Sequence, residues 1–214
     1  MTRYTHIIWD WNGTLLDDVA WCMDCINKML VRRGLPVIST VEAYRDVFGF
    51  PVKDYYRRAG FDFASEPFED LAVEFMELYH GENAETALFP GAREVLSTLQ
   101  AYGVRQIILS ASEAENLKNQ IKPFDLDKYF DEILGISHIY ATSKIELGKT
   151  YIQRVKPDKA VLIGDTAHDM ETAEALGVDC ILAAGGHHNR ASLEACGAPV
   201  VDKLADICGM ITIN

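Results

Sequence analysis

The stretch that decides the fold is His6-Ile7-Ile8-Trp9-Asp10-Trp11-Asn12-Gly13-Thr14-Leu15, near the start of the 214-residue chain. Its first four residues form a short, β-prone run that leads directly into Asp10. Asn12 and Gly13 then give a turn signal. The pattern predicts a buried strand that delivers a carboxylate into a loop. Such a strand needs sheet partners, so further strands are expected elsewhere in the chain.

A helical pattern follows the first strand. From Asp17 to Gly34 apolar residues recur at three- and four-residue spacing, and Gly34 suits a helix end. Two further helices are expected, over Val41–Arg45 and Phe68–Tyr79. We therefore assign residues 17–88 to an inserted helical cap domain, which ends at the boundary Phe89-Pro90-Gly91.

Strands and helices alternate after that boundary. Repeated β–α units predict a parallel sheet with helices on both faces. Residues 1–16 and 89–214 are accordingly assigned to an α/β, Rossmann-like core domain. Further strands are expected at Arg105–Leu109 (ending at Ser110), Glu132–Ile136, Ala160–Ile163 and Val178–Leu182. Helices are expected at Ala92–Gln100, Asn116–Ile121, Leu147–Val155, Met170–Leu176 and Ser192–Cys196.

A second acidic motif, Gly164-Asp165-Thr166-Ala167-His168-Asp169, directly follows the Ala160–Ile163 strand. Ligands of open α/β sheets bind beyond the carboxyl ends of the strands. Asp10, Asp165 and Asp169 are therefore expected to converge. Carboxylates held together repel one another unless a cation compensates. Mg2+ suits best, because it accepts few carboxylates and keeps positions for water and substrate phosphate.

Composition narrows the range of partners. The formal net charge of −12 disfavours nucleic acid, whereas a small anion remains compatible because a metal and local cations reverse the field in a cleft. The start, Met1–His6, has no apolar leader, and no run is long enough to span a membrane, so we expect a cytoplasmic protein without a membrane partner. Cys22 and Cys25 form a C-x-x-C that we interpret as buried packing residues. Both a monomer and a homodimer remain open.

Taken together, the motifs resemble the haloacid dehalogenase-like hydrolase superfamily, in its phosphoglycolate phosphatase-like branch. The resemblance covers essentially the whole chain. It implies a Rossmann-like core with a helical cap inserted after the first motif, and a Mg2+-dependent phosphatase of small phosphorylated metabolites. The motifs that carry it are Asp10 to Leu15, Phe89-Pro90-Gly91, Ser110 after a strand, a downstream lysine, and Gly164 to Asp169.

The resemblance also implies roles for the acidic motifs. Asp10 would attack phosphorus, become phosphorylated and bind the metal. The Asn12 backbone carbonyl and the Asp165 carboxylate would also bind Mg2+. Asp169 would bind it through water or orient the other ligands.

Other positions are expected to contact the phosphate. Ser110 would donate a hydrogen bond to a phosphoryl oxygen, with Ala111 beside it among the substrate-binding residues. A lysine would offset the charge of Asp10 and of the transferring group. We favour Lys144, in a loop after Ala141-Thr142-Ser143, over Lys149, which lies within the following helix.

Asn12 departs from the family pattern. Most phosphatases of this superfamily have an Asp there, which acts as general acid and then as base. An amide cannot exchange a proton at neutral pH. We therefore expect slow turnover of alkyl phosphates, and we expect Asn12→Asp to raise it. His168 is an alternative proton donor.

The cap is expected to select the substrate. Phe48-Gly49-Phe50-Pro51 precedes Lys53, and Arg57 and Arg58 follow; these cations either bind substrate or form a solvated helix face. Trp11 is expected to shape the entrance. Separately, Gly185-Gly186-His187-His188 is interpreted as a loop beside the site, and not as a metal centre, because no third soft ligand is evident.

Two alternatives to a phosphatase remain open. One is hydrolysis of a carbon–phosphorus bond, with Lys53 as an imine-forming group. The other is a catalytically weak phosphate-binding or regulatory protein that kept the metal site.

Overall fold

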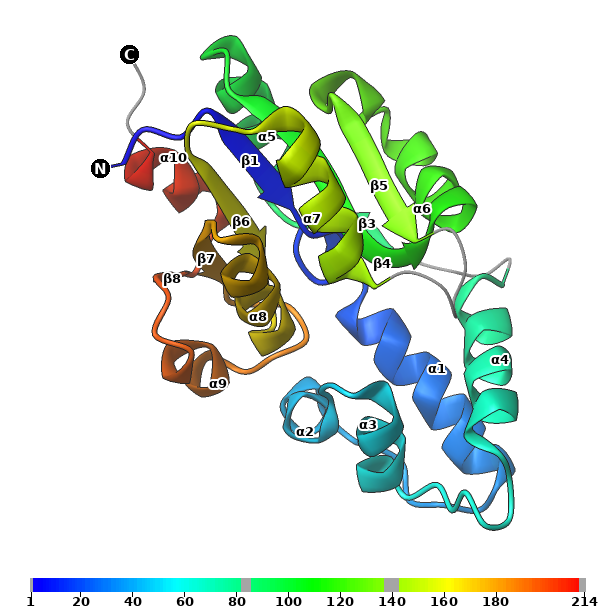
Figure 1. Cartoon of the computed structure of the whole chain (residues 1–214). Helices are drawn as coiled ribbons and strands as arrows, with labels where there is room; N and C mark the ends of the chain where they lie inside the picture. The colour runs from blue at the N-terminus through cyan, green and yellow to red at the C-terminus, as the bar shows by residue number, and fades with distance from the viewer. Residues whose placement is uncertain (1, 82–85, 137–142, 212–214) are drawn as a thin grey trace.

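The centre of the protein is a six-stranded parallel sheet. The computed structural model describes residues 2–81, 86–136 and 143–211, and the strand order is β5-β4-β1-β6-β7-β8 (Figure 1). The first strand lies in the middle, with Trp9 paired to Ile108 on one side and to Ile163 on the other. The strands are β1 (His6–Trp9), β4 (Arg105–Glu113), β5 (Glu132–Ile136), β6 (Ala160–Gly164), β7 (Asp179–Ala183) and β8 (Val200–Val201).

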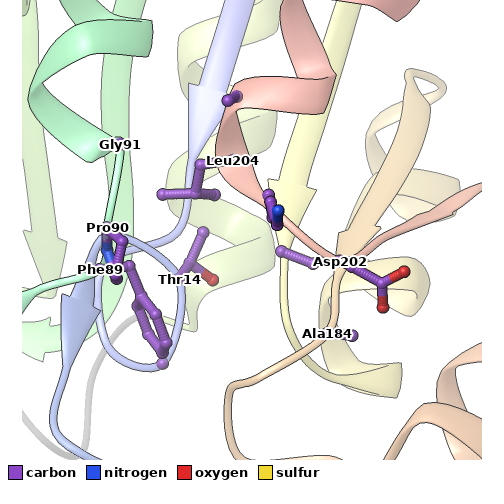
Figure 2. Close-up of a pocket in the computed structure, with 11 residues that line it drawn as sticks. Thr14, Phe89, Pro90, Gly91, Ala184, Asp202 and Leu204 are labelled. Carbon is purple, nitrogen blue, oxygen red and sulfur yellow. The ribbon is translucent and has the colours of Figure 1, made fainter.

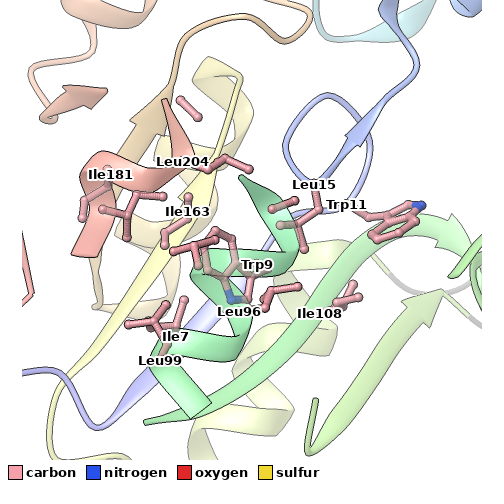
Figure 3. Packing of buried hydrophobic residues seen from close by; sticks show 14 of the residues in the cluster. Ile7, Trp9, Trp11, Leu15, Leu96, Leu99, Ile108, Ile163, Ile181 and Leu204 are labelled. Carbon is pink, nitrogen blue, oxygen red and sulfur yellow. The ribbon is translucent and has the colours of Figure 1, made fainter. Parts of the chain in front are cut away.

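Both faces of this sheet are buried. Ile7 and Trp9 of β1 belong to one hydrophobic cluster with side chains of α5, α6 and α10 (Figure 3). Ile8 points the other way, into a cluster with α7, α8 and α9. Successive strand residues face opposite sides, so a strand covered on both faces needs a continuous apolar run. The helices are α5 (Ala92–Ala101), α6 (Ala114–Ile121), α7 (Lys144–Val155), α8 (Ala167–Leu176), α9 (Arg190–Ala195) and α10 (Ile207–Met210).

Among the described residues, four helices lie between Asp17 and Ala87 in the chain and form a group beside the sheet (Figure 1). Their own hydrophobic cluster includes Ile26, Tyr44, Tyr56 and Leu71. A short antiparallel pair, β2 (Leu16–Asp17) and β3 (Ala87–Leu88), brings the chain out to the cap and back at one place. The cap helices are α1 (Val19–Arg32), α2 (Val41–Val47), α3 (Val52–Ala59) and α4 (Phe68–Tyr79).

The α/β fold class predicted from the sequence is confirmed, with differences in detail. β4 continues to Glu113 after a register shift at Leu109, so Ser110 lies within this strand and not at its end.

The division of the chain at residues 17–88 stays a prediction. No helix of the described ranges is long and apolar enough to cross a membrane. α3 corresponds to the solvated helix face that was one alternative for Lys53, Arg57 and Arg58. The elements that the sequence did not predict are α10, β2, β3, β8 and the 3-10 turns Lys122–Phe124, Asp127–Tyr129 and Leu204–Asp206.

Gly135 in β5 tests the packing of the extended part of β4. A Cβ at this position would lie 2.8 Å from both the Ala114 Cα and the Ser112 carbonyl oxygen, and backbone atoms cannot rotate away. We expect Gly135→Ala to lower the free energy of unfolding by about 2 kcal/mol, measured by urea denaturation. Gly209→Ala is the matched control, because no atom lies within 4 Å of its added Cβ. Equal stability of the two variants would contradict this packing.

Candidate active site

Three carboxylates meet at the carboxyl end of the central strands. Asp10 follows β1, Asp165 follows β6, and Asp169 lies in the first turn of α8. One carboxylate oxygen from each of the three residues lies within 4.8 Å of those of the other two. The three residues are buried, with exposed fractions of 8%, 0% and 2%. The expected convergence of the two acidic motifs is therefore present in the structure.

Lys144 lies between two of these carboxylates. Its Nζ donates to Asp10 Oδ1 and, at 2.6 Å, to Asp169 Oδ1. The sequence placed this lysine in a loop, but it is the first residue of α7. The Ser143 hydroxyl caps this helix by accepting from Glu146 N–H at 3.2 Å. Residues 141 and 142, the rest of the expected loop, lie outside the described residues.

Two threonines fix the orientation of the acidic side chains. The Thr14 hydroxyl donates to Asp165 Oδ1 at 2.9 Å and lies 3.4 Å from Asp10 Oδ2. Thr166 and Asp169 form a reciprocal cap of α8, in which Thr166 Oγ1 donates to Asp169 Oδ2 at 2.7 Å. Asp169 is thus held by a residue of its own motif, whereas Asp165 is held by Thr14 of the first motif.

Burial dominates the electrostatics of the cluster. It raises the pKa of Asp10 to about 8, although Lys144 acts against it, and it raises the pKa of Asp165 to about 6. Burial also acts on Asp169, but Lys144 and Thr166 hold the pKa of that carboxyl below its usual value. Burial alone would lower the pKa of Lys144; Asp10 and Asp169 raise it above its ordinary value. The lysine therefore stays charged, and Asp10 and Asp165 lack sufficient positive charge.

The donor set fits a hard divalent cation. Burial raises the pKa values of Asp10 and Asp165 although Lys144 acts against it at Asp10 and His187 at Asp165, so further positive charge would stabilise the ionised cluster. All donors in the group Asp10, Asp165 and Asp169 are oxygens, which Mg2+ and Ca2+ prefer. The residues present are thus able to hold a metal ion.

The Asn12 side chain is fully engaged in hydrogen bonds. Its Nδ2 donates to Asp18 Oδ2 at 2.9 Å and to the Tyr79 hydroxyl at 2.7 Å. Its Oδ1 accepts from the Ser112 hydroxyl at 2.9 Å. Asn12 therefore connects the loop after β1 with the cap helix α4 and with β4.

Asp18 and His187 are site residues that were not predicted from the sequence. Asp18 is 1% exposed and accepts from Gly13 N–H at 2.9 Å and from the Tyr79 hydroxyl at 2.6 Å. His187 Nε2 lies 3.2 Å from Asp18 Oδ1, and His187 N–H donates to Asp165 Oδ2 at 2.7 Å. Burial would raise the pKa of Asp18, but His187 lowers it; in turn the Asp18 charge raises the pKa of His187 to about 9 against the effect of burial.

The loop that contains His187 also joins the core to the cap. Arg45 of α2 donates to the Gly186 carbonyl at 2.8 Å and to the Gly185 carbonyl at 2.5 Å. The Phe48 ring stacks on the His187 ring, with centroids 4.7 Å apart. The expectation that residues 185–188 lie beside the site agrees with these contacts. The paired glycines were the sequence signal that this loop approaches the acidic cluster closely, because a Cβ at Gly186 would overlap the Asp165 side chain.

Two expected substrate contacts are elsewhere in the structure. Trp11 is fully buried in the core cluster and its Nε1 donates to Gln120 Oε1 at 3.1 Å, so it does not shape an entrance (Figure 3). The Lys53 Nζ lies 5.5 Å from the ring centres of Phe63 and Phe68 within the cap, which does not support an imine-forming role at Asp10.

The other expected contact positions fall into two groups. Ser110 is buried and its Oγ accepts from Ser112 N–H at 3.1 Å, whereas Ala111 is exposed on β4. The remaining basic candidates contact surface groups. Lys149 pairs with Glu146, Arg57 with Asp54, Arg58 donates to the Val47 carbonyl, and His168 contacts Glu171 and the Phe50 ring.

A cavity of about 400 Å3 borders the cluster through Thr14 (Figure 2). It lies between the loop after β1, the Phe89-Pro90-Gly91 boundary and the segment after β8. None of the three clustered carboxylates lines it. In the closed arrangement of the cap, this cavity is therefore not the space in front of Asp10.

Comparison with known proteins gives consistent results. The family model described as haloacid dehalogenase-like hydrolase matches residues 7–183. Phosphoglycolate phosphatase 1 of Pseudomonas aeruginosa is 26% identical over 211 residues, which cover 94% of this chain and 77% of that protein. Tyrosine-protein kinase PtkA of Mycobacterium tuberculosis is 24% identical over 205 residues, with coverages of 94% and 69%. A haloacid dehalogenase-like family protein from Streptococcus pneumoniae superposes with a TM-score of 0.84 at 21% identity, covering 98% of this chain and 99% of that one.

The two candidate lysines give a direct test of the charge balance. Removal of Lys144 leaves Asp169 and Asp10 buried without their cation, whereas Lys149 makes an exposed pair with Glu146. In metal-free buffer we expect Lys144→Ala to lower the free energy of unfolding by about 3 kcal/mol. Lys149→Ala should change it by less than about 0.5 kcal/mol. Urea denaturation of both variants measures the difference, and equal effects would contradict a structural role of Lys144.

Proposed function

Because the chain belongs to the haloacid dehalogenase-like hydrolase family, as a phosphatase of its phosphoglycolate phosphatase-like branch, we propose that it hydrolyses a small phosphorylated metabolite through a phosphorylated Asp10. The single observation that carries the proposal is the arrangement around that carboxylate. Asp10 lies within 4.8 Å of two further carboxylates and pairs with the buried Lys144. This arrangement suits an anionic substrate only if a metal ion shares the site.

Mg2+ is the proposed cofactor. Asp10 and Asp165 would hold it together with the Asn12 backbone carbonyl, and Asp169 would orient these ligands. When bound, the ion supplies positive charge to the phosphoryl oxygens and lowers the repulsion between substrate and carboxylates. Lys144 adds a second positive charge on the opposite side of the Asp10 carboxylate from Thr14: its Nζ bonds Oδ1, while Thr14 lies beside Oδ2.

In the proposed reaction Asp10 attacks phosphorus. A bond forms between a carboxylate oxygen and phosphorus while the ester bond to the leaving oxygen breaks, and the leaving alkoxide takes up a proton. Water then attacks the phosphoryl group, which releases inorganic phosphate and restores Asp10. Lys144 favours the ionised form of Asp10 that this attack requires. Ser110 is proposed to donate its hydroxyl to a phosphoryl oxygen, since its Oγ already accepts from Ser112 N–H.

The leaving group limits the rate in this proposal. Asn12 occupies the usual position of the proton donor, and its amide is committed to Asp18, Tyr79 and Ser112. An amide does not supply a proton. Alkyl esters should therefore react slowly, and aryl or acyl phosphates, whose leaving groups need no proton, should react faster.

Substrate entry requires the cap to move. Asp10 is 8% exposed, and Arg45 joins the cap to the loop at Gly185 and Gly186. β2 and β3 are the only two strands that link cap and core among the described residues, so they are the natural hinge. The closed arrangement excludes water from the acidic cluster, which strengthens the contacts made there.

The nucleophile is tested with a panel of phosphate esters. We expect p-nitrophenyl phosphate, acetyl phosphate and 2-phosphoglycolate to be hydrolysed with Mg2+ and not with EDTA. Asp10→Asn should lower kcat by at least about a thousandfold. Asp24→Asn is the control, because that carboxylate pairs with Lys28 on the surface of α1 and should leave kcat unchanged.

The same experiment separates the alternatives. Calorimetric binding of Mg2+ and phosphate without turnover of any ester would favour a phosphate-binding or regulatory protein. Full activity of Asp10→Asn would contradict the aspartyl-phosphate route. A carbon–phosphorus hydrolase would release phosphate from a phosphonate added to this panel, and borohydride would trap its imine, although the position of Lys53 does not favour this reaction.

The role of position 12 is tested by Asn12→Asp. The introduced carboxyl would lie beside Asp18, because the Asn12 amide is 2.9 Å from that carboxylate. A like charge raises a carboxyl pKa, which keeps the introduced group protonated for use as a general acid. We expect kcat for an alkyl phosphate to rise by about a hundredfold, and kcat for p-nitrophenyl phosphate to rise much less.

Asn12→Ala is the matched control for this experiment, since it removes the contacts to Asp18 and Tyr79 without adding an acid. It should not raise kcat for either ester. An Asn12→Asp variant that binds Mg2+ normally yet gains no activity on the alkyl ester would contradict the account of the leaving group.

A further inference from the structure

A second group of possible metal ligands adjoins the acidic cluster but shares no residue with it. It consists of Asp18 before α1, Cys22 in the first turn of α1 and His187 after β7. Their ligand atoms lie within 4.8 Å of one another. His187 Nε2 is 3.2 Å from Asp18 Oδ1, and Cys22 Sγ is 3.6 Å from Asp18 Oδ2. Ligands around a tetrahedral zinc ion are separated by about 3.3–3.8 Å, given metal–ligand bonds of about 2.0–2.3 Å.

The surroundings orient these groups as a metal site requires. His187 Nδ1 forms a 2.9 Å hydrogen bond with the Tyr44 hydroxyl, which leaves Nε2 directed at Asp18. The Gly13 N–H holds Asp18 Oδ1 at 2.9 Å, and the Tyr79 hydroxyl approaches Asp18 Oδ2 at 2.6 Å. Metal-ligating histidines and carboxylates are commonly fixed by such outer hydrogen bonds. All three candidate ligands are buried.

The charge balance also permits exchange of protons for a divalent cation. With Asp18 ionised, His187 protonated and Cys22 a thiol, the group is neutral. If Cys22 Sγ–H and His187 Nε2–H each release a proton to solvent as the cation enters, the group is neutral again. Burial beside Asp18 raises the pKa of the Cys22 thiol well above its usual value, so a bound cation is needed to hold the thiolate.

We propose that Asp18, Cys22 and His187 form a binding site for zinc or a similar borderline divalent cation, separate from the Asp10 cluster. Thiolate and imidazole ligands select such ions, whereas Mg2+ prefers oxygen. A water would complete four-coordination. A metal centre at the paired histidines was not expected from the sequence, because no third soft ligand was evident there. The fold supplies Cys22, and one histidine of the pair takes part.

An ion in this site would connect the cap to the core. Asp18 and Cys22 belong to the segment that enters the cap, while His187 lies on the loop whose backbone N–H contacts Asp165. Occupation would hold the cap closed over Asp10. Zinc would therefore act as a reversible inhibitor of any activity that needs the cap to open.

Cobalt reports on the site, since Co2+ bound to a thiolate gives a charge-transfer band in the near ultraviolet. The reduced full chain is incubated with excess Mg2+, to fill oxygen-ligand sites, and titrated with Co2+. We expect one thiolate-bound Co2+ per chain, displaced by Zn2+. The band should be lost in Cys22→Ala and kept in Cys25→Ala, because Cys25 is buried on the same helix but is not one of the three clustered ligands.

X-ray absorption at the zinc edge of the wild-type protein gives a second readout that needs no variant. One sulfur at about 2.3 Å with nitrogen and oxygen at about 2.0 Å would support the site. A shell of oxygen and nitrogen alone, or a cobalt–thiolate band that survives Cys22→Ala, would overturn it. Neither result depends on phosphatase activity, so the proposed function is tested separately.

Discussion

The structure depends on keeping three like charges close together in a buried place. Asp10, Asp165 and Asp169 are brought there because parallel strands all present their carboxyl ends at one edge of the sheet. Without compensation this arrangement would destabilise the fold, and burial together with the neighbouring carboxylates raises the pKa values of Asp10 and Asp165. Lys144 neutralises part of the charge. The remainder is the charge that the proposed Mg2+ would balance.

A second buried charge pair, Asp18 with His187, joins the start of the cap to the core. Asp18 lies where the chain leaves the core, and His187 lies on the loop that the cap must meet when it closes. Because each group is buried, each needs the other as a partner, so their contact favours the closed cap. Asn12 and Tyr79 share the same carboxylate. Asn12, two positions after the proposed nucleophile, thus joins the core loop to the cap through Asp18 and Tyr79. These contacts offer a physical reason why an amide stands where most phosphatases of this family have a proton donor.

Local patterns in the sequence were sufficient for the elements with strong periodicity. Phe68–Tyr79 and Glu132–Ile136 were predicted with the bounds that the structure has, and the two acidic motifs were placed at strand ends correctly. Short elements such as β2 and β8 depend on partners far away in the chain, so no local signal marks them. α3 was foreseen only as an alternative, a solvated helix face for Lys53, Arg57 and Arg58, because its eight residues are mostly charged and aromatic.

The residues of the candidate site also divide into those that the sequence predicted and those that it did not. Asp10, Asp165 and Asp169 follow recognisable strands, so their convergence could be predicted, and Ser143 with Glu146 was an unused signal that α7 begins at Lys144. Asp18 and His187 are 169 positions apart, and the fold makes them neighbours where the start of α1 meets the loop after β7. A contact between segments so far apart in the chain has no counterpart in local sequence.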